Sequence, residues 1–320
     1  MRRLSILAVT LILAAGLSAD DVIRKGFNVA EGGTLHLEGA VGAIKIVSGG
    51  TGVAVEIVRD ADGRRGERQL REHKITFEQR GNDVVINSDH DDDNRWNFFD
   101  WDDDYEVQWN IRVPARYNLK VSTSGGSIDL ANIGGTVDAR TSGGSIKTGV
   151  LAGESTLKTS GGSITVGGSN ARLSVHTSGG SINIGNTSGT VEAKTSGGSI
   201  TLAQIRGDVV ARTSGGGIRI EDAMGSVDAS TSGGSISARI SQQPNADSKL
   251  STSGGGVTVT LASSIKVDLD ARASGGGVRS DVPVTVQGTQ DEDTLRGEVN
   301  GGGPKLVLRT SGGGIRVKSL

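Results

Sequence analysis

One hexapeptide recurs through most of the chain at a fixed spacing, and this spacing constrains the fold more than any other feature. The motif Thr-Ser-Gly-Gly-Ser-Ile, with small variations, begins at Thr123 and returns every 18 residues up to Thr231. Variants with a third glycine follow at Thr252, Ala273 and Thr310, after steps of 21, 21 and 37 residues. A constant period of this length indicates stacked units, each of which buries its apolar side chains only against its neighbours.

Each unit contains two short strands separated by two corners. Before the threonine, small or apolar residues alternate with polar ones, as in Val137-Asp138-Ala139, which is typical of a half-buried strand. After the Ser-Gly-Gly corner the alternation resumes, for example at Ile164 and Val166. Glycine suits the corners because it accepts a positive φ and because it has no Cβ to block close stacking.

These observations predict an all-β fold: a right-handed parallel β-helix, or β-solenoid, with 18-residue two-strand coils that stack about 4.8 Å apart. Two other 18-residue solenoids fit less well. A left-handed hexapeptide helix needs an inward residue every six positions, but that phase falls on Gly143 and Gly149. The calcium β-roll repeats a turn aspartate that these corners lack, so we place no metal there.

Residues 1–19 have the composition of a secretory signal peptide. Arg2 and Arg3 precede an apolar run over 4–15, and small residues lead to Ala19. The run is too short to span a bilayer, so we predict no transmembrane segment. The expected location is outside the cytoplasm: periplasmic, cell-surface or extracellular.

The remaining chain, 20–320, is predicted to be a single continuous domain. We expect N-terminal solenoid coils over 20–58, where Leu35 and Leu37 match the template and Val53 and Val55 restart it 18 residues later. An insertion follows over 59–118, with a β-hairpin around a Gly-Asn turn and an acidic loop. The main solenoid covers 119–320 and is interrupted at about 284–304.

The last predicted coil runs from Leu306 to Val317 and ends close to an open solenoid end. Exposed strand edges at a solenoid end can pair with a second copy, so self-association at the ends is conceivable.

Composition excludes several functions. The net charge is −2, which gives no support to nucleic-acid binding. Cysteine is absent, which excludes disulfides, thiol catalysis and cysteine-ligated zinc. The four histidines are scattered and match no metal or catalytic motif, so we expect no cofactor, no metal site and no enzymatic activity.

The segment 89–109 combines many carboxylates with most of the chain's aromatic residues. Stacked rings and carboxylates suit a carbohydrate, and clustered carboxylates also suit calcium, although the spacing matches no EF-hand. The favoured interpretation is an acidic loop whose rings cover an exposed solenoid edge. The candidate ligand-binding residues are Trp96, Trp101, Asp91, Asp93, Asp102 and Asp104.

A second candidate surface comes from the position just before the corner threonine. Five consecutive coils carry a basic side chain there, and strand alternation turns it outward. We call these residues the basic stack: Arg140, Lys158, His176, Lys194 and Arg212. Such a stack suits an anionic partner such as an acidic polysaccharide. The favoured alternative is local pairing with acids of the same face: Asp138, Glu192, Asp228 or Asp270.

Three stretches resemble a known bacterial family. Gly32–Leu37, the entry Ile111-Arg-Val-Pro leading into Val121–Ile128, and the closing Gly301–Ile315 are similar to the bacterial domain family of unknown function named "putative adhesin". The resemblance covers essentially the whole mature chain. It implies an exported β-helical protein and supplies no catalytic residues. We therefore expect an adhesin, or a structural or binding protein of the cell envelope, of unknown ligand; the two candidate surfaces make a glycan or an envelope component conceivable as partner. The alternative is a carbohydrate-binding or carbohydrate-active protein that uses the 89–109 segment.

Overall fold

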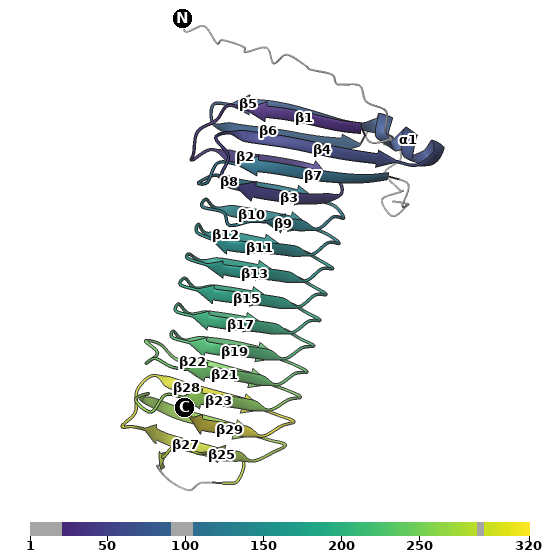
Figure 1. The fold of residues 1–320 in the computed structure, drawn as a ribbon. Helices are drawn as coiled ribbons and strands as arrows, with labels where there is room; N and C mark the ends of the chain where they lie inside the picture. Colours follow the sequence, from purple (N-terminus) through teal and green to yellow (C-terminus); the bar gives the residue numbers. More distant parts are fainter. Residues whose placement is uncertain (1–20, 91–104, 287–290) are drawn as a thin grey trace, which may run out of the picture.

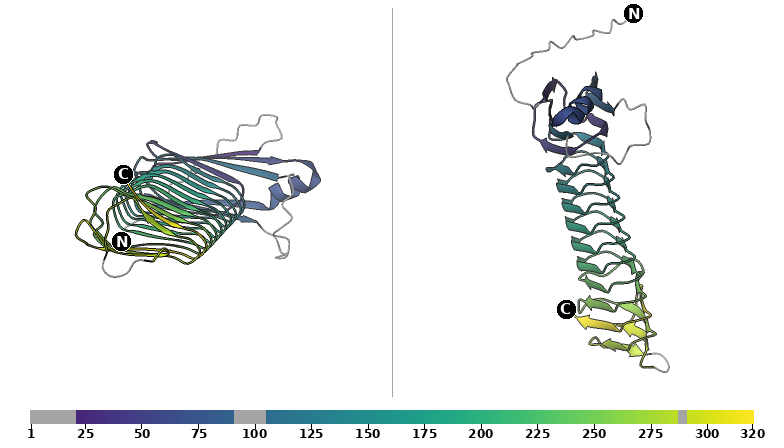
Figure 2. Two further views of the ribbon diagram at one scale, coloured as in Figure 1. Left: turned by 90° about the horizontal axis from the view of Figure 1, so that it is seen from below. Right: turned by 90° about the vertical axis from the view of Figure 1, so that its right-hand side faces the viewer.

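The computed structural model describes residues 21–90, 105–286 and 291–320, and these form a long rod (Figure 1). Two sheets run along the rod, a first sheet of 14 strands and a second sheet of 15 strands. Seen from the end, the coils enclose a flattened cross-section, and the two sheets lie face to face (Figure 2). The fold is therefore the predicted β-solenoid.

The middle of the rod repeats one two-strand coil. Along it, Ile146 pairs with Ile164, and Ile164 with Ile182, so each step is 18 residues. The first sheet takes β9 (Ile128–Leu130), β11 (Ile146–Leu151), β13 (Ile164–Ser169), β15 (Ile182–Thr187), β17 (Ile200–Ile205), β19 (Ile218–Ala223), β21 (Ile236–Ile240) and β23 (Val257–Leu261). The second sheet takes β8 (Asn118–Thr123), β10 (Val137–Thr141), β12 (Ser155–Lys158), β14 (Leu173–His176), β16 (Val191–Lys194), β18 (Val209–Arg212), β20 (Val227–Thr231) and β22 (Ser248–Thr252).

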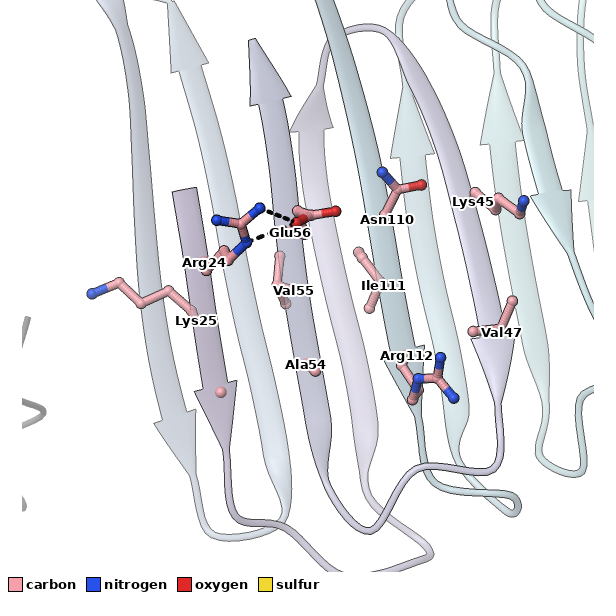
Figure 3. A pocket seen from close by; sticks show the side chains of 11 residues that line it. Arg24, Lys25, Lys45, Val47, Ala54, Val55, Glu56, Asn110, Ile111 and Arg112 are labelled. Atoms are coloured by element: carbon pink, nitrogen blue, oxygen red, sulfur yellow. Dashed lines mark hydrogen bonds and ion pairs between the residues drawn. The ribbon is translucent and has the colours of Figure 1, made fainter. Parts of the chain in front are cut away.

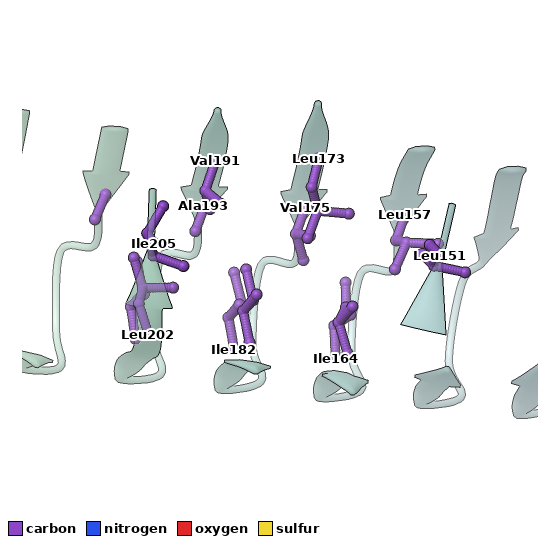
Figure 4. Packing of buried hydrophobic residues seen from close by; sticks show 14 of the residues in the cluster. Leu151, Leu157, Ile164, Leu173, Val175, Ile182, Val191, Ala193, Leu202 and Ile205 are labelled. Atoms are coloured by element: carbon purple, nitrogen blue, oxygen red, sulfur yellow. The ribbon is translucent and has the colours of Figure 1, made fainter. Parts of the chain in front are cut away.

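Aliphatic side chains fill the space between the sheets. Ile164 and Ile182 of the first sheet face Leu157, Leu173 and Val175 of the second, and all five are buried (Figure 4). Because equivalent side chains repeat in every coil, they form continuous columns along the rod axis. Each coil therefore buries its apolar surface only through the coils on either side.

The corner threonines belong to the core and do not face solvent. Thr177 is fully buried, and its hydroxyl donates a 2.8 Å hydrogen bond to the carbonyl oxygen of Gly162 in the preceding coil. The same bond recurs from Thr159 to Gly144 and from Thr195 to Gly180. These bonds satisfy buried carbonyls at the corner and tie each coil to the one before it.

The corner glycines are required for stacking and not for an unusual φ. A Cβ on Gly180 would lie 2.1 Å from the carbonyl oxygen of Gly162, a distance that no side chain tolerates. None of the corner glycines is among the glycines with a positive φ. Of the two expected reasons for glycine, only the absence of a Cβ applies.

The N-terminal end differs from the expected run of coils. The first coil consists of β2 (Thr34–Ala40) and β3 (Ala43–Ser48), and it stacks on β8 and β9. On its other side lies a coil made by β6 (Asp83–His90) and β7 (Tyr105–Val113), from within the predicted insertion. The first coil in the sequence is thus held between two coils that follow it.

The prediction that Val53 and Val55 restart the coil is wrong. They lie in β4 (Val53–Ala61), which runs antiparallel to β7. The turn after β3 contains Gly49 with a φ of 102° and sends the chain back across the first sheet. Alternating valines bury equally well in either strand direction, which is why the pattern did not reveal this reversal.

Antiparallel strands complete this end of both sheets. β1 (Asp21–Phe27) pairs with β4, and β5 (His73–Arg80) pairs with β6 in the hairpin expected around Gly81. The helix α1 (Gly63–Glu72) links β4 to β5 and was not predicted. Its sequence is almost wholly polar, so it lacks the apolar periodicity that marks a packed helix.

The C-terminal end also departs from sequence order. The last coil, β28 (Lys305–Thr310) and β29 (Ile315–Ser319), lies between β22–β23 on one side and β24 (Val267–Ala273) and β25 (Val278–Ser280) on the other. β27 (Thr294–Val299) pairs antiparallel with β24, and β26 (Thr285–Val286) with β27. The chain therefore ends inside the stack, and the terminal coil of the rod is an earlier one.

Candidate functional site

The basic stack forms as the repeat predicts. Strand pairing places Arg140 beside Lys158, Lys158 beside His176, His176 beside Lys194, and Lys194 beside Arg212. All five lie at the surface, with Lys194 the only one that is half-buried. Adjacent strands are about 4.8 Å apart, so the stack is a line of basic groups along the outer face of the second sheet.

Neighbouring carboxylates pair with three members of the stack. Arg140 contacts Asp138 at 2.7 Å, Arg212 contacts Asp228 at 2.6 Å, and Lys194 pairs with Glu192. The Lys194 ammonium, through its hydrogen bond, lowers the pKa of the Glu192 carboxyl. Local pairing, the favoured alternative, therefore holds at these positions.

Lys158 and His176 are the exceptions. The positions two residues earlier, which carry the acidic partners of Arg140 and Lys194, are Thr156 and Ser174 in these coils. Within the described part of the chain, neither Lys158 nor His176 forms an ion pair. The centre of the stack thus presents basic groups that form no ion pair among the described residues.

The other predicted site falls largely outside the described residues. Its candidates are Trp96, Trp101, Asp91, Asp93, Asp102 and Asp104, and all six lie in the segment 91–104, which is not described. The two ends of the segment are placed: it leaves β6 after His90 and enters β7 at Tyr105. The described ends of β6 and β7 mark one corner of the coil that these two strands form.

A buried hydrogen-bonded cluster beside this corner was not predicted. The His73 ring contacts the Tyr105 hydroxyl through Nδ1 at 2.6 Å and the Ser88 hydroxyl through Nε2 at 2.7 Å. Burial raises the pKa of Tyr105 to about 12, so the phenol stays neutral at physiological pH. The cluster joins β5, β6 and β7 where the undescribed segment begins. Sequence spacing gave no signal for it, because its residues come from three strands.

A hollow of about 590 Å³ lies on the outer face of the first sheet at its N-terminal end. Figure 3 shows its side chains on β1, β4, β7 and β3, with Arg24 joined to Glu56 and with Lys45 and Arg112 nearby. We call it the basic hollow. No sequence motif indicated it, since it unites residues from four strands that are separate in the sequence.

Asp270 connects three strands of the C-terminal end. It lies on β24 and accepts hydrogen bonds from Arg309 of β28 and Arg296 of β27. Burial acts to raise the pKa of the Asp270 carboxyl, but the two guanidinium groups outweigh it and hold the pKa below its usual value of 3.8. A carboxyl with a lowered pKa stabilises the fold above its unfolded pKa and loses that contribution as the pH falls through the folded one.

Replacing Asp270 with asparagine should therefore weaken acid sensitivity. We expect the D270N substitution to lower the stability at pH 7 by about 1 kcal/mol and to reduce the loss of stability below about pH 4. Thermal unfolding followed by circular dichroism between pH 7 and pH 2.5 measures both effects. Asp129, an exposed carboxylate without an ion pair in the described residues, supplies the control D129N. Equal acid profiles for D270N and the unmodified chain would contradict the assignment.

The described residues hold neither a cluster of metal ligands nor a helix that could span a membrane. No group of three or more histidine, cysteine, aspartate or glutamate side chains in these residues is placed to hold a metal ion. No helix in the described ranges has the length and apolar character needed to cross a membrane.

Comparison with known proteins gives distant structural matches only. No family model and no curated protein matches the chain. A putative adhesin from Bacteroides fragilis has 13% identity and a TM-score of 0.36, and the match covers 94% of this chain and 97% of that one. A putative lipid binding protein from Parabacteroides distasonis has 12% identity and a TM-score of 0.32, with coverage of 93% and 96%. A putative cell adhesion protein from Clostridium sporogenes has 13% identity and a TM-score of 0.23, with coverage of 94% and 100%.

Two of these three names agree with the family resemblance inferred from the sequence. The TM-scores are below 0.5, so we base the fold on strand pairing and draw no functional conclusion from these matches.

Proposed function

We propose that this chain is an exported, non-enzymatic, adhesin-like protein of the bacterial cell envelope that binds an anionic envelope glycan along its rod. The observation that carries the proposal is the basic stack, a line of basic side chains on five successive coils. A repeating polymer can contact equivalent positions on several coils at once. Weak contacts then add up to a useful affinity.

The distribution of acids along the stack supports this assignment. Arg140 and Arg212, the outermost members, are paired with carboxylates, whereas Lys158 and His176 near the centre have none within the described residues. A solvated basic group without a local partner is available to an anion from outside. The expected signal peptide and the resemblance to the adhesin family support an envelope component as this partner.

A single charge reversal tests the stack. We expect the K158E substitution to weaken binding to acidic glycans on an array of bacterial envelope glycans by about tenfold or more. Lys249 is an exposed lysine on the same face of the second sheet but outside the stack, so K249E is the matched control. Equal binding by the two variants, or no glycan binding by the unmodified chain, would refute the proposed function.

The same array examines the carbohydrate-binding alternative. A double substitution, Trp96→Ala with Trp101→Ala, removes the two tryptophans of the acidic segment. If this variant alone loses binding, the glycan site is the 89–109 segment and not the stack. Release of shortened glycan products would show that the chain is a carbohydrate-active enzyme and would overturn the non-enzymatic assignment.

A further inference from the structure

The basic hollow is built from two rows of outward side chains that cross four strands. One row contains Arg24, Glu56, Asn110 and Lys45, each paired with the next across neighbouring strands. The other row, two residues along each strand, contains Gly26, Ala54, Arg112 and Val47. Gly26 and Ala54 have little or no side chain, so the surface is depressed there and the longer side chains form its rim.

The charge of the rim is positive and only partly compensated. Glu56 is the one carboxylate of the described lining. The Nη2 and Nε atoms of Arg24 lie 2.7 and 2.8 Å from its Oε1 atom. Lys45 and Arg112 form no ion pair with any described residue. Lys25 also belongs to the lining, but its ammonium lies 6.0 Å from the ring centroid of Phe77. Two cations are thus left for a ligand.

The Arg112 stem lies against the turn after β3. A Cβ on Gly50, in the turn after β3, would lie 3.1 Å from Cγ and 3.4 Å from Cδ of Arg112, so the arginine stem passes closely over this glycine. The Gly50 amide donates a 3.0 Å hydrogen bond to the carbonyl oxygen of Val113, which fixes the turn against β7. The exposed Arg112 side chain extends beside this turn, where its guanidinium is available to a planar anion.

We propose that the basic hollow binds a carboxylated sugar, such as a uronic acid unit of an acidic polysaccharide. Arg112 and Lys45 receive the carboxylate, because a guanidinium matches the two oxygens of a carboxylate in a bidentate pair. Gly26 and Ala54 give the sugar ring a flat floor. The Asn110 amide and the free Oε2 atom of Glu56 lie beside this floor and exchange hydrogen bonds with ring hydroxyls (Figure 3).

The position of the hollow suits a polymer. β1 is the outermost strand of the first sheet, so the floor at Gly26 is open toward the end of the rod. A sugar chain can enter over Val47 and leave past Gly26 without meeting another strand. This site is separate from the basic stack, which lies on the second sheet, and its existence does not depend on the function proposed for the stack.

Titration calorimetry with oligogalacturonic acid tests the site on the purified chain. We expect the double substitution Lys45→Gln with Arg112→Gln to weaken binding at least tenfold, about 1.4 kcal/mol. The matched control is Arg279→Gln with Arg316→Gln, which removes two cations from the outer face of the first sheet at its other end. The control should bind like the unmodified chain. Equal weakening in both variants would reveal non-specific charge attraction and overturn the proposal, as would no binding by the unmodified chain.

Two further ligands identify the chemistry that is recognised. The methyl ester of the same oligomer retains the rings and hydroxyls but lacks the charge, so we expect it to bind at least tenfold more weakly. Polyphosphate supplies charge without a sugar and should bind in a way that the double substitution does not alter. If the ester binds equally well, the carboxylate assignment is wrong. If polyphosphate competes fully and loses its affinity in the double variant, the site recognises anions and not sugars.

Discussion

Removing residues 159–176 should leave a folded solenoid, whereas removing 159–167 should abolish cooperative folding. The longer deletion takes out one complete coil, so that β11 meets β15 and β12 meets β16, with inward residues at the same repeat positions. Each coil contacts only its neighbours, and we therefore expect the Tm to fall by about 5 °C or less.

The nine-residue deletion has a different structural consequence. It removes the core of β13 from the first sheet, while the second sheet keeps both β12 and β14. β11 and β15 would then lie two strand spacings apart, about 10 Å, which is too far for backbone hydrogen bonds. We expect loss of the sharp thermal transition seen by circular dichroism.

The control for the deletions is a second 18-residue block with a different starting point, 150–167. Because removal of any complete period restores the register, it should be tolerated like 159–176. Equal tolerance of the nine-residue deletion would contradict the two-strand coil.

Replacing a single corner glycine with alanine should destabilise the solenoid strongly at one position and have little effect at the neighbouring position. A Cβ on Gly144 would lie 2.2 Å from the carbonyl oxygen of Gly126 and 2.6 Å from the amide nitrogen of Ser127. These are backbone atoms of the adjacent coil, which cannot move without breaking the stack. We expect G144A to cost about 3 kcal/mol and to lower the Tm by roughly 10 °C.

Gly143, the neighbouring residue, is the matched control. A Cβ there would meet the Gly125 carbonyl oxygen at 3.4 Å, an ordinary contact, so G143A should change the stability by less than about 1 kcal/mol. Thermal denaturation of the two variants under one condition gives the comparison. A similar loss in both would show that the corners need glycine for a reason other than the missing Cβ.

The repeated part of the fold was predictable because sequence identity and structural equivalence coincide there. Each inward isoleucine, such as Ile164 or Ile182, pairs with its own equivalent one period away. The ends lack this information. β4 satisfies the same alternation as a coil strand but runs in the opposite direction, and nothing in Val53 or Val55 distinguishes the two. The order of the last coils was equally hidden, because a stack of near-identical corners does not fix which coil is next to which.

The candidate sites differ in the same way, because one lies in the repeated part of the fold and the others lie at its N-terminal end. The basic stack was predictable because its members occupy one repeat position, and the structure adds which of them have carboxylate partners. The basic hollow was not, because the antiparallel strands β1 and β4 bring Arg24 to this face, and β7, from within the predicted insertion, brings Arg112 beside β3 and Lys45. The His73 cluster depends on the same unpredicted arrangement.

The placement of the last coil between β22–β23 and β24–β25 has a consequence for biogenesis. A solenoid built in strict chain order can add each coil to the one before it. Here the coil of β28 and β29 must insert between two coils that precede it in the sequence, so this end of the stack is completed only when residues 305–320 are in place. A prematurely terminated chain that lacks 305–320 leaves the facing edges of β22 and β24 without their shared partner, and this exposes it to proteolytic clearance.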